Sequence, residues 1–347
     1  MKNEKILVIC ASGVGNTILF TPTLKAIRRA HRKAKITLFV TNPIFAEPIK
    51  GSQLADEIIV FDDSKSFLEK IKLVLKLRSG KFDYSITAFP SNRWQFNVFA
   101  FLAGAKKRIT HSYKIGGIKT LSFLQNVKVP VNENLHDVDQ NLNLLKPLKI
   151  SSPEEKKLLF YLSEKEEGPV ENFWRENNLN DSFVVGIHPG SGGIKQETKR
   201  WPIDKFIKLG NRLIKENKAK ILIFGGRGEE KLKNKIKNST VKNQSFVINS
   251  SLKLTAALIA KCNLFIANDS GLMHIAAAKG VKTIGIFGPT NYKRTAPYGK
   301  NCYIVRKKLP CSSCLKYPFH STSSKIKCKR NFECLEEIKV KNIIEAI

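Results

Sequence analysis

The chain has 347 residues, of which 60 are Lys or Arg and 29 are Asp or Glu, so its formal net charge is +31. This length exceeds one typical hydrophobic core, and 42% hydrophobic residues suffice for two domains. The charge favours an anionic partner (nucleic acid, an anionic membrane surface or a phosphorylated glycolipid), or else it reflects a lysine-rich solvated surface. No apolar run is long enough to cross a bilayer, so we expect no membrane-spanning helix.

The N-terminal segment reads as a buried strand. Residues 6–10 are apolar and follow Lys5, but the run is too short for the core of a signal peptide. It ends in a glycine turn rather than in a cleavage site. We therefore expect a cytoplasmic protein that touches a membrane, if at all, at the inner face of the cell membrane and only through its own surface.

Strands and helices alternate along the chain. In the first half the predicted strands are 6–10, 36–40, 57–61 and 84–88, and the predicted helices are 17–29, 67–78 and 92–102. In the second half the predicted strands are 183–188, 221–224, 246–248, 264–267 and 283–287, and the predicted helices are 203–216, 229–236 and 254–261. Continuous apolar strands between amphipathic helices indicate parallel sheets that are covered on both faces.

Two such units in series predict an α/β protein of two Rossmann-like, doubly wound domains that face a central cleft. The charged and polar stretch 147–180 is the expected joint. We take residues 1–165 as the first domain and 166–347 as the second.

The first predicted strand leads into a glycine turn that opens a helix. Gly13, Gly15 and Asn16 form this turn and are candidate ligand-binding residues. The turn matches a dinucleotide fingerprint poorly, because the third glycine and the acidic residue that should follow the second strand are missing. A plain strand-to-helix turn is the better interpretation than a nicotinamide site.

The strand end at His188 in the second half suits a phosphate group. His188 ends a strand and is followed by Gly190 and Ser191, and then by Lys199 and Arg200. Small residues and a pair of cations at the carboxyl end of a strand predict a phosphate-binding lip. We expect Trp201 to form a wall of it.

Glu229 follows another glycine-rich strand end, where its carboxylate either accepts hydrogen bonds from ribose hydroxyls or only caps a helix. Three such strand ends in one sheet converge on one edge, which favours a nucleotide.

The third strand end is the most informative. Asp269 and Ser270 can cap a helix, Gly271 allows a ligand close to the backbone, and His274 returns to the same face one turn later. The start of a helix offers free N–H groups and partial positive charge to a diphosphate. The simpler alternative is an ordinary turn with a capping Asp and a packed His.

Three segments carry a resemblance to a known family: His188-Pro189-Gly190, Lys199-Arg200-Trp201-Pro202, and Asn268-Asp269-Ser270-Gly271 with His274 and the later Phe287-Gly288-Pro289-Thr290. Together with Gly13-Val14-Gly15, Pro22 and Leu24 they resemble glycosyltransferase family 9, the heptosyltransferases of lipopolysaccharide core synthesis, essentially end to end. The resemblance implies a GT-B fold and an inverting, metal-independent transferase that uses a sugar nucleotide, typically ADP-heptose. It also implies that the second domain binds the nucleotide sugar and that the first receives the acceptor, an anionic glycolipid or glycan.

In this interpretation the donor site comprises His188, Gly190, Ser191, Lys199, Arg200, Trp201, Glu229, Asp269, Ser270, Gly271 and His274. Lys199 and His274 would stabilise the charge that develops on the departing diphosphate. Asp269 would orient the turn or a sugar hydroxyl.

One position departs from the family. The family usually has Asp where this chain has Asn16, and an amide cannot act as a general base. Another group such as His111 or Asp83 then serves as the base, or the acceptor loses its proton late in a loose transition state, or the protein is a weak or inactive relative. The intact donor motifs favour a divergent active enzyme, with Asn16 positioning the acceptor.

Four cysteines near the C-terminus, Cys311, Cys314, Cys328 and Cys334, are spaced almost as in a zinc ribbon. The last pair is wider than usual, and similar cysteines are common in the resembling family. We therefore weigh a structural zinc against reduced structural thiols, which we favour. No cofactor is required for the expected reaction.

Other classes of protein fit less well. A nucleic-acid-binding protein would explain the charge, but no recognition helix, finger or aromatic stacking pattern accompanies it. A nicotinamide oxidoreductase would explain the sheets but not the poor glycine match. The closest rival is a transferase for a different nucleotide sugar, such as a hexose or amino sugar.

Overall fold

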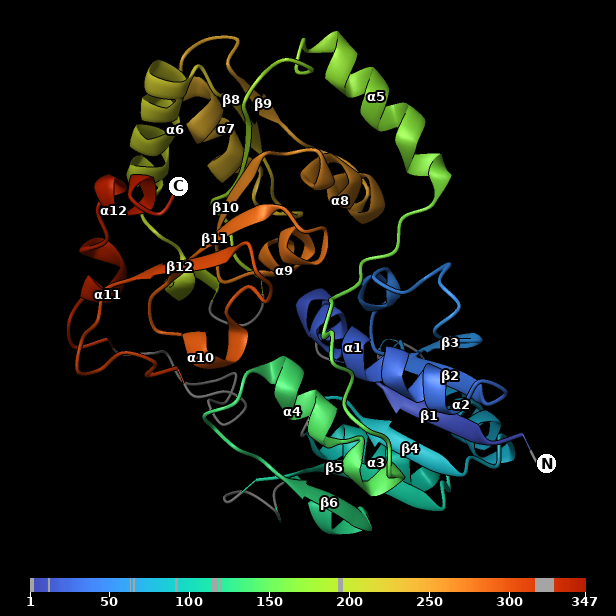
Figure 1. Cartoon of the computed structure of the whole chain (residues 1–347). Coiled ribbons are helices and arrows are strands. Elements are labelled where there is room, and N and C mark those ends of the chain that lie inside the picture. Colours follow the sequence, from blue (N-terminus) through green and yellow to red (C-terminus); the bar gives the residue numbers. More distant parts are fainter. Residues whose placement is uncertain are drawn as a thin grey trace. The chain divides into compact units, whose positions relative to one another are not determined.

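The structure is a computed structural model that describes residues 3–11, 13–62, 64, 66–90, 93–113, 118, 120–192, 196–315 and 328–347. The chain divides into two compact units, Met1–Tyr161 and Leu162–Ile347, and each contains one six-stranded parallel sheet (Figure 1). The expected doubly wound α/β class is confirmed. The division after Tyr161 lies close to the expected boundary at 165.

The first sheet has the strand order β3-β2-β1-β4-β5-β6. Its strands are β1 (Lys5–Ile9), β2 (Lys35–Val40), β3 (Glu57–Val60), β4 (Tyr84–Thr87), β5 (Lys107–Ser112) and β6 (Val127–Pro130). Its helices are α1 (Val14–Ala30), α2 (Phe67–Ser79), α3 (Trp94–Leu102) and α4 (Asp137–Asn143).

Helices cover both faces of this sheet (Figure 1). Leu77 of α2 and Phe96 of α3 pack in one hydrophobic cluster with Leu7 and Ile9 of β1. Because neighbouring residues of a strand point to opposite faces, Ile6 and Val8 face the other side, and both are fully buried. Helices α1 and α4 contact each other.

The second sheet has the strand order β12-β11-β10-β7-β8-β9. Its strands are β7 (Val184–His188), β8 (Lys220–Ile223), β9 (Ser245–Val247), β10 (Leu264–Asn268), β11 (Lys282–Phe287) and β12 (Cys302–Arg306). The helices are α5 (Glu167–Glu176), α6 (Ile203–Asn217), α7 (Glu230–Ser239), α8 (Leu252–Ala260), α9 (Gly271–Ala278), α10 (Tyr292–Thr295), α11 (Glu333–Glu336) and α12 (Val340–Ile344).

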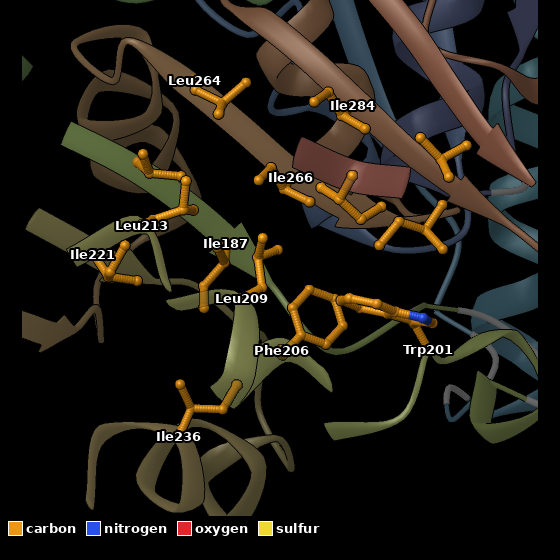
Figure 2. Close-up of a cluster of buried hydrophobic side chains, with 14 of the residues drawn as sticks. Ile187, Trp201, Phe206, Leu209, Leu213, Ile221, Ile236, Leu264, Ile266 and Ile284 are labelled. Carbon is orange, nitrogen blue, oxygen red and sulfur yellow. The ribbon is translucent and has the colours of Figure 1, made fainter. Parts of the chain in front are cut away.

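The core of the second unit lies between its sheet and helices α6 and α7. Ile187 of β7 and Ile266 of β10 meet Leu209 and Leu213 of α6 and Ile236 of α7 in one buried cluster (Figure 2). Amphipathic helices that bury their apolar faces in this way hold the strands in a fixed frame. The packed strands therefore fix the positions at which the loops at their carboxyl ends begin.

Among the residues that the structure describes, every helix is too short or too polar to traverse a lipid bilayer.

Candidate functional site

Three adjacent strands bring the predicted donor residues to one edge of the second sheet. Strand β7 pairs with β10 on one side and with β8 on the other. Because all three are parallel, the segments after His188, Ile223 and Asn268 leave from the same edge. The structure thus brings together the three strand ends that the sequence singled out.

Helix α9 starts at this edge. Ser270 is its N-cap residue, and its Oγ accepts a hydrogen bond from the N–H of Met273 at 3.5 Å. The first N–H groups of a helix have no acceptor within the helix, and the helix dipole adds partial positive charge there, so the start of α9 at Gly271 is suited to an anion. His274 lies in α9 and is buried, with 5% of its surface exposed. This burial agrees with the simpler alternative of a packed His as well as with a ligand at its edge.

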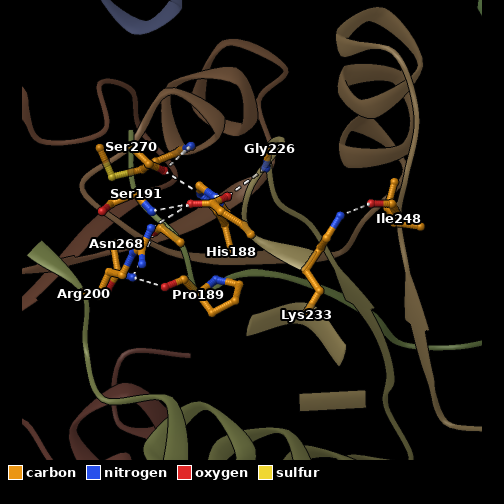
Figure 3. A network of polar contacts seen from close by, with 12 residues as sticks. His188, Pro189, Ser191, Arg200, Gly226, Lys233, Ile248, Asn268 and Ser270 are labelled. Atoms are coloured by element: carbon orange, nitrogen blue, oxygen red, sulfur yellow. Dashed lines mark hydrogen bonds and ion pairs between the residues drawn. The ribbon is translucent and has the colours of Figure 1, made fainter. Parts of the chain in front are cut away.

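A buried polar chain links Ser270 to His188 (Figure 3), and His188 in turn to Glu229. Nδ1 of His188 lies 2.9 Å from Oγ of Ser270, and Nε2 lies 3.1 Å from Oε2 of Glu229. A carboxylate can only accept, so Nε2 carries a proton and donates it to Glu229, while Nδ1 and the Ser270 hydroxyl form the second hydrogen bond. The chain fixes the rotamer of the residue that caps α9.

Glu229 has more partners than this imidazole. Its carboxylate accepts from the N–H of Ser191 at 3.0 Å and of Gly226 at 2.7 Å, and Arg200 lies 3.4 Å away. Burial by itself would raise the pKa of Glu229, but the hydrogen bond and charge of His188 and the two N–H donors outweigh it and lower the pKa to about 2. Glu229 is therefore an anion that ties the loops after β7 and β8 together. Both sequence-based alternatives, ribose binding and helix capping, overlooked this internal role.

Asn268 is a residue of the site whose role the sequence analysis missed. It is fully buried; its Oδ1 accepts from the N–H of Trp201 at 2.9 Å, and its Nδ2 donates to the carbonyls of Pro189 and Gly190 at 2.8 and 3.1 Å. One side-chain amide thus joins the end of β10 to both ends of the segment that connects β7 with α6. A polar residue ending an otherwise apolar strand was the available signal.

The two predicted cations lie at different places. Lys199 Nζ is 3.4 Å from the carbonyl oxygen of Asp269 and 3.8 Å from its Oδ2, which puts the ammonium beside the start of α9. Arg200 instead turns to Glu229. Lys199 thus places a positive charge beside the N-terminus of this helix.

Trp201 corrects one expectation. Its side chain is 1% exposed, stacks edge-on with Phe206 at 5.0 Å between ring centroids, and donates from Nε1 to the carbonyl of Ile338 at 3.0 Å. It belongs to the hydrophobic core (Figure 2) rather than to a wall of the phosphate site. Large apolar surface favours burial once an acceptor for the indole N–H is in reach.

The glycine turn of the first unit leads directly into α1. Gly13 is the N-cap residue with φ 124°, a conformation that L side chains rarely adopt. Gly15 and Asn16 lie in the first turn of α1, and Asn16 is half-buried. This turn follows β1 at the carboxyl edge of the first sheet.

The two alternative bases lie elsewhere. Asp83 precedes β4 at the amino edge of the sheet and binds the N–H of Lys5 and Nζ of Lys106. His111 is 2% exposed, its ring nitrogens face the carbonyls of Val129 and Gln140, and burial lowers its pKa to about 4. Neither position matches that of Asn16.

The four C-terminal cysteines line one cavity of about 20 Å³, together with Pro289. The N–H of Leu315 donates to the carbonyl of Pro289, so part of the Phe287-Gly288-Pro289-Thr290 segment serves to hold the cysteine-containing chain. Among residues in the described parts of the chain, no three His, Cys, Asp or Glu side chains are arranged to hold a metal ion. The cysteines in the structure are free thiols.

Comparison with known proteins bears on these observations. Residues 70–323 match the model of glycosyltransferase family 9 (heptosyltransferase). Lipooligosaccharide heptosyltransferase 2 of Campylobacter jejuni subsp. jejuni is 28% identical over an alignment of 361 residues, which covers 98% of this chain and 96% of the relative. Lipooligosaccharide heptosyltransferase 2 of Haemophilus influenzae is 32% identical over 133 residues, 37% of this chain and 38% of the relative.

Solved structures agree in fold. A family 9 glycosyl transferase from Veillonella parvula superposes with a TM-score of 0.83 at 21% identity, over 100% of this chain and 97% of that one. Escherichia coli ADP-heptose heptosyltransferase II gives a TM-score of 0.75 at 21% identity, over 99% and 97% of the two chains. The expected GT-B fold is confirmed by these likenesses.

Proposed function

Since the chain belongs to glycosyltransferase family 9, the heptosyltransferase family, we propose that it transfers heptose from ADP-heptose to a lipopolysaccharide or lipooligosaccharide core acceptor. It is a glycosyltransferase by family, and the family supports glycosyl transfer in the synthesis of these glycans. An E. coli relative of the same fold was solved with ADP-2-deoxy-2-fluoro heptose, which favours an ADP-sugar donor.

The observation that carries the proposal is the pairing of Lys199 with the start of α9. An ammonium and the N–H groups at the start of α9 lie at one place, which suits the diphosphate of the donor. Bond cleavage increases the charge on the diphosphate, so the same groups bind the transition state more strongly than the ground state. Support for a cation-based, metal-independent mechanism comes from these residues. We assign His188, Ser191, Glu229 and Asn268 to positioning.

On the acceptor side we propose that Asn16 orients the hydroxyl of the acceptor. The amide cannot take its proton, so the proton leaves late, to a phosphate of the substrate or to water, from a loose transition state with inversion at the anomeric carbon. The half-buried place of Asn16 after a glycine turn supports a positioning role. The anionic acceptor and an anionic membrane suit a chain of net charge +31.

A nucleotide screen by thermal shift tests the donor. We expect ADP and ADP-heptose to raise Tm more than UDP-, GDP- or other sugar nucleotides, since a ligand at 100 times its Kd adds about 2.7 kcal/mol. Lys199→Ala should remove most of this rise and reduce kcat/KM at least roughly tenfold, while Lys242→Ala, an exposed lysine of the same unit, should change neither. A larger rise in Tm with UDP- or GDP-sugars would identify one of these as the donor instead of ADP-heptose. If no nucleotide raises Tm, the proposed function is wrong.

A further inference from the structure

Helix α2 exposes an apolar stripe. Phe67, Leu68, Ile71 and Leu75 are 77%, 69%, 40% and 59% exposed, whereas Leu77 on the inward side is 1% exposed. With 3.6 residues per turn, the four exposed side chains fall within one third of the helix circumference. Their arrangement is therefore a continuous stripe and not a scatter of single surface residues, which would need no explanation.

The neighbouring helix α3 also exposes apolar side chains. Helix α3 contacts α2, and its Trp94 and Phe101 are 51% and 45% exposed and lie on one side of the helix at a spacing of seven residues. Both helices cover the same face of the first sheet, as their inward residues Leu77 and Phe96 share a cluster. We call the set Phe67, Leu68, Ile71, Leu75, Trp94 and Phe101 the α2–α3 surface.

Positive charge flanks the stripe. Helix α2 carries Lys70, Lys72, Lys76 and Arg78 but only one acidic residue, Glu69. Lys72 lies next to the stripe around the helix and Arg78 lies within it, whereas Lys76 lies farther round and pairs with Glu57 at 3.0 Å. A helix with an apolar stripe, aromatic residues and a lysine-rich flank is typical of helices that lie in the headgroup region of a membrane.

We propose that the α2–α3 surface docks on an anionic lipid bilayer, with the apolar side chains inserted at the headgroup level and the lysines on the lipid phosphates. The need for such a surface rests on the proposed function, because a core acceptor is held in a membrane. Charge favours a bilayer over a second copy of the chain as the partner of this surface. Two chains of net charge +31 repel each other, and protein–protein interfaces are poor in lysine.

Sedimentation with vesicles tests the surface. Full-length protein is mixed with vesicles of phosphatidylcholine alone or with one quarter phosphatidylglycerol, at low and high salt. We expect binding to the anionic vesicles that weakens with salt, and a loss of roughly tenfold or more in the double variant Phe67→Ser, Leu75→Ser. The matched control is Val241→Ser, Tyr303→Ser, two residues of the second unit that are 48% and 44% exposed; it should bind as the parent does.

The outcomes separate this proposal from the proposed function. Both double variants should keep the ADP-induced rise in Tm and the turnover of a water-soluble acceptor. Equal vesicle binding by the parent and the Phe67, Leu75 variant would overturn the docking surface while leaving the function intact. A parent that is dimeric by light scattering, and becomes monomeric in that variant, would overturn it too by assigning the surface to a second copy.

Discussion

Gly190 and Glu229 lie so close together that a Cβ on Gly190 would stand 1.9 Å from Oε1 of the Glu229 carboxylate. Position 190 must therefore lack a side chain, because the buried Glu229 carboxylate is held by four partners and cannot move away from a Cβ. The motif His188-Pro189-Gly190 is thereby explained by packing around an anion rather than by a bend of the chain.

We therefore expect Gly190→Ala to destabilise the second unit by about 1–3 kcal/mol and to weaken ADP binding, because the loop must shift to admit one methyl group. Tm and the ADP-induced rise in Tm are the measurements. Gly192→Ala is the control, since a Cβ there meets none of the described atoms within 4 Å. Wild-type values in Gly190→Ala would show that the loop is free to move.

The low pKa of Glu229 predicts a dependence of stability on pH. The folded-state pKa of about 2 lies below the ordinary 4.5, so the ionised carboxylate stabilises the folded state fully above pH about 4.5 and loses this contribution as the pH falls toward 2. A shift of this size corresponds to about 3 kcal/mol.

The difference in Tm between wild type and Glu229→Gln should thus be large at pH 7 and shrink on acidification below pH 4.5. Glu230→Gln, at the exposed next position, should differ little from wild type at any pH. A difference that stays constant down to pH 3 would contradict the role of the charge.

The sequence predicted the sheets where strands are continuous apolar runs, as in β1, β7 and β10, and missed β5, β6 and β12. Strand β5 reads Lys-Arg-Ile-Thr-His-Ser, and β12 is an edge strand with exposed residues, so periodicity did not distinguish them from loops. Their pairing depends on neighbours that are distant in the chain.

For the site, the strand ends were predictable because parallel strands share one edge, but side-chain partners were not. Glu229 and His188 are 41 residues apart, and nothing local to either shows that a carboxylate will turn toward an imidazole. Trp201 looked like a wall because it follows two cations, whereas its burial depends on the C-terminal carbonyl of Ile338.

The core position of Trp201 leads to a prediction about stability. Trp201→Ala should cost about 3–5 kcal/mol, and Trp201→Phe should cost less because a ring remains against Phe206 while the bond to Ile338 is lost. The ADP-induced rise in Tm should persist in Trp201→Phe. If ADP binding weakens in Trp201→Phe while Tm is unchanged, Trp201 contacts the ligand after all.

The cysteine cluster is expected to consist of reduced thiols. Burial and the neighbouring thiols raise the pKa of Cys334 to about 11, which favours the protonated form. Because Cys311 and Cys314 are exposed, the double variant Cys311→Ser, Cys314→Ser should keep its Tm within a few degrees. Metal analysis should find less than roughly half an equivalent of zinc or iron per chain. A full equivalent, with a Tm that falls on chelation, would establish a structural metal instead.

Asn16 offers the sharpest test of the mechanism, because two substitutions separate positioning from proton transfer. If the amide orients the acceptor, Asn16→Ala should raise KM for the acceptor and lower turnover while the ADP-induced rise in Tm stays as in wild type; unchanged turnover would reject any role. Asn16→Asp introduces a carboxylate that can accept the acceptor proton, and general-base catalysis adds about 10²–10⁴ in rate when geometry allows. We expect kcat to rise and the pH profile to gain an acidic limb that the wild type lacks. If instead kcat falls in Asn16→Asp and its pH profile keeps the wild-type shape, the wild-type enzyme already uses another base.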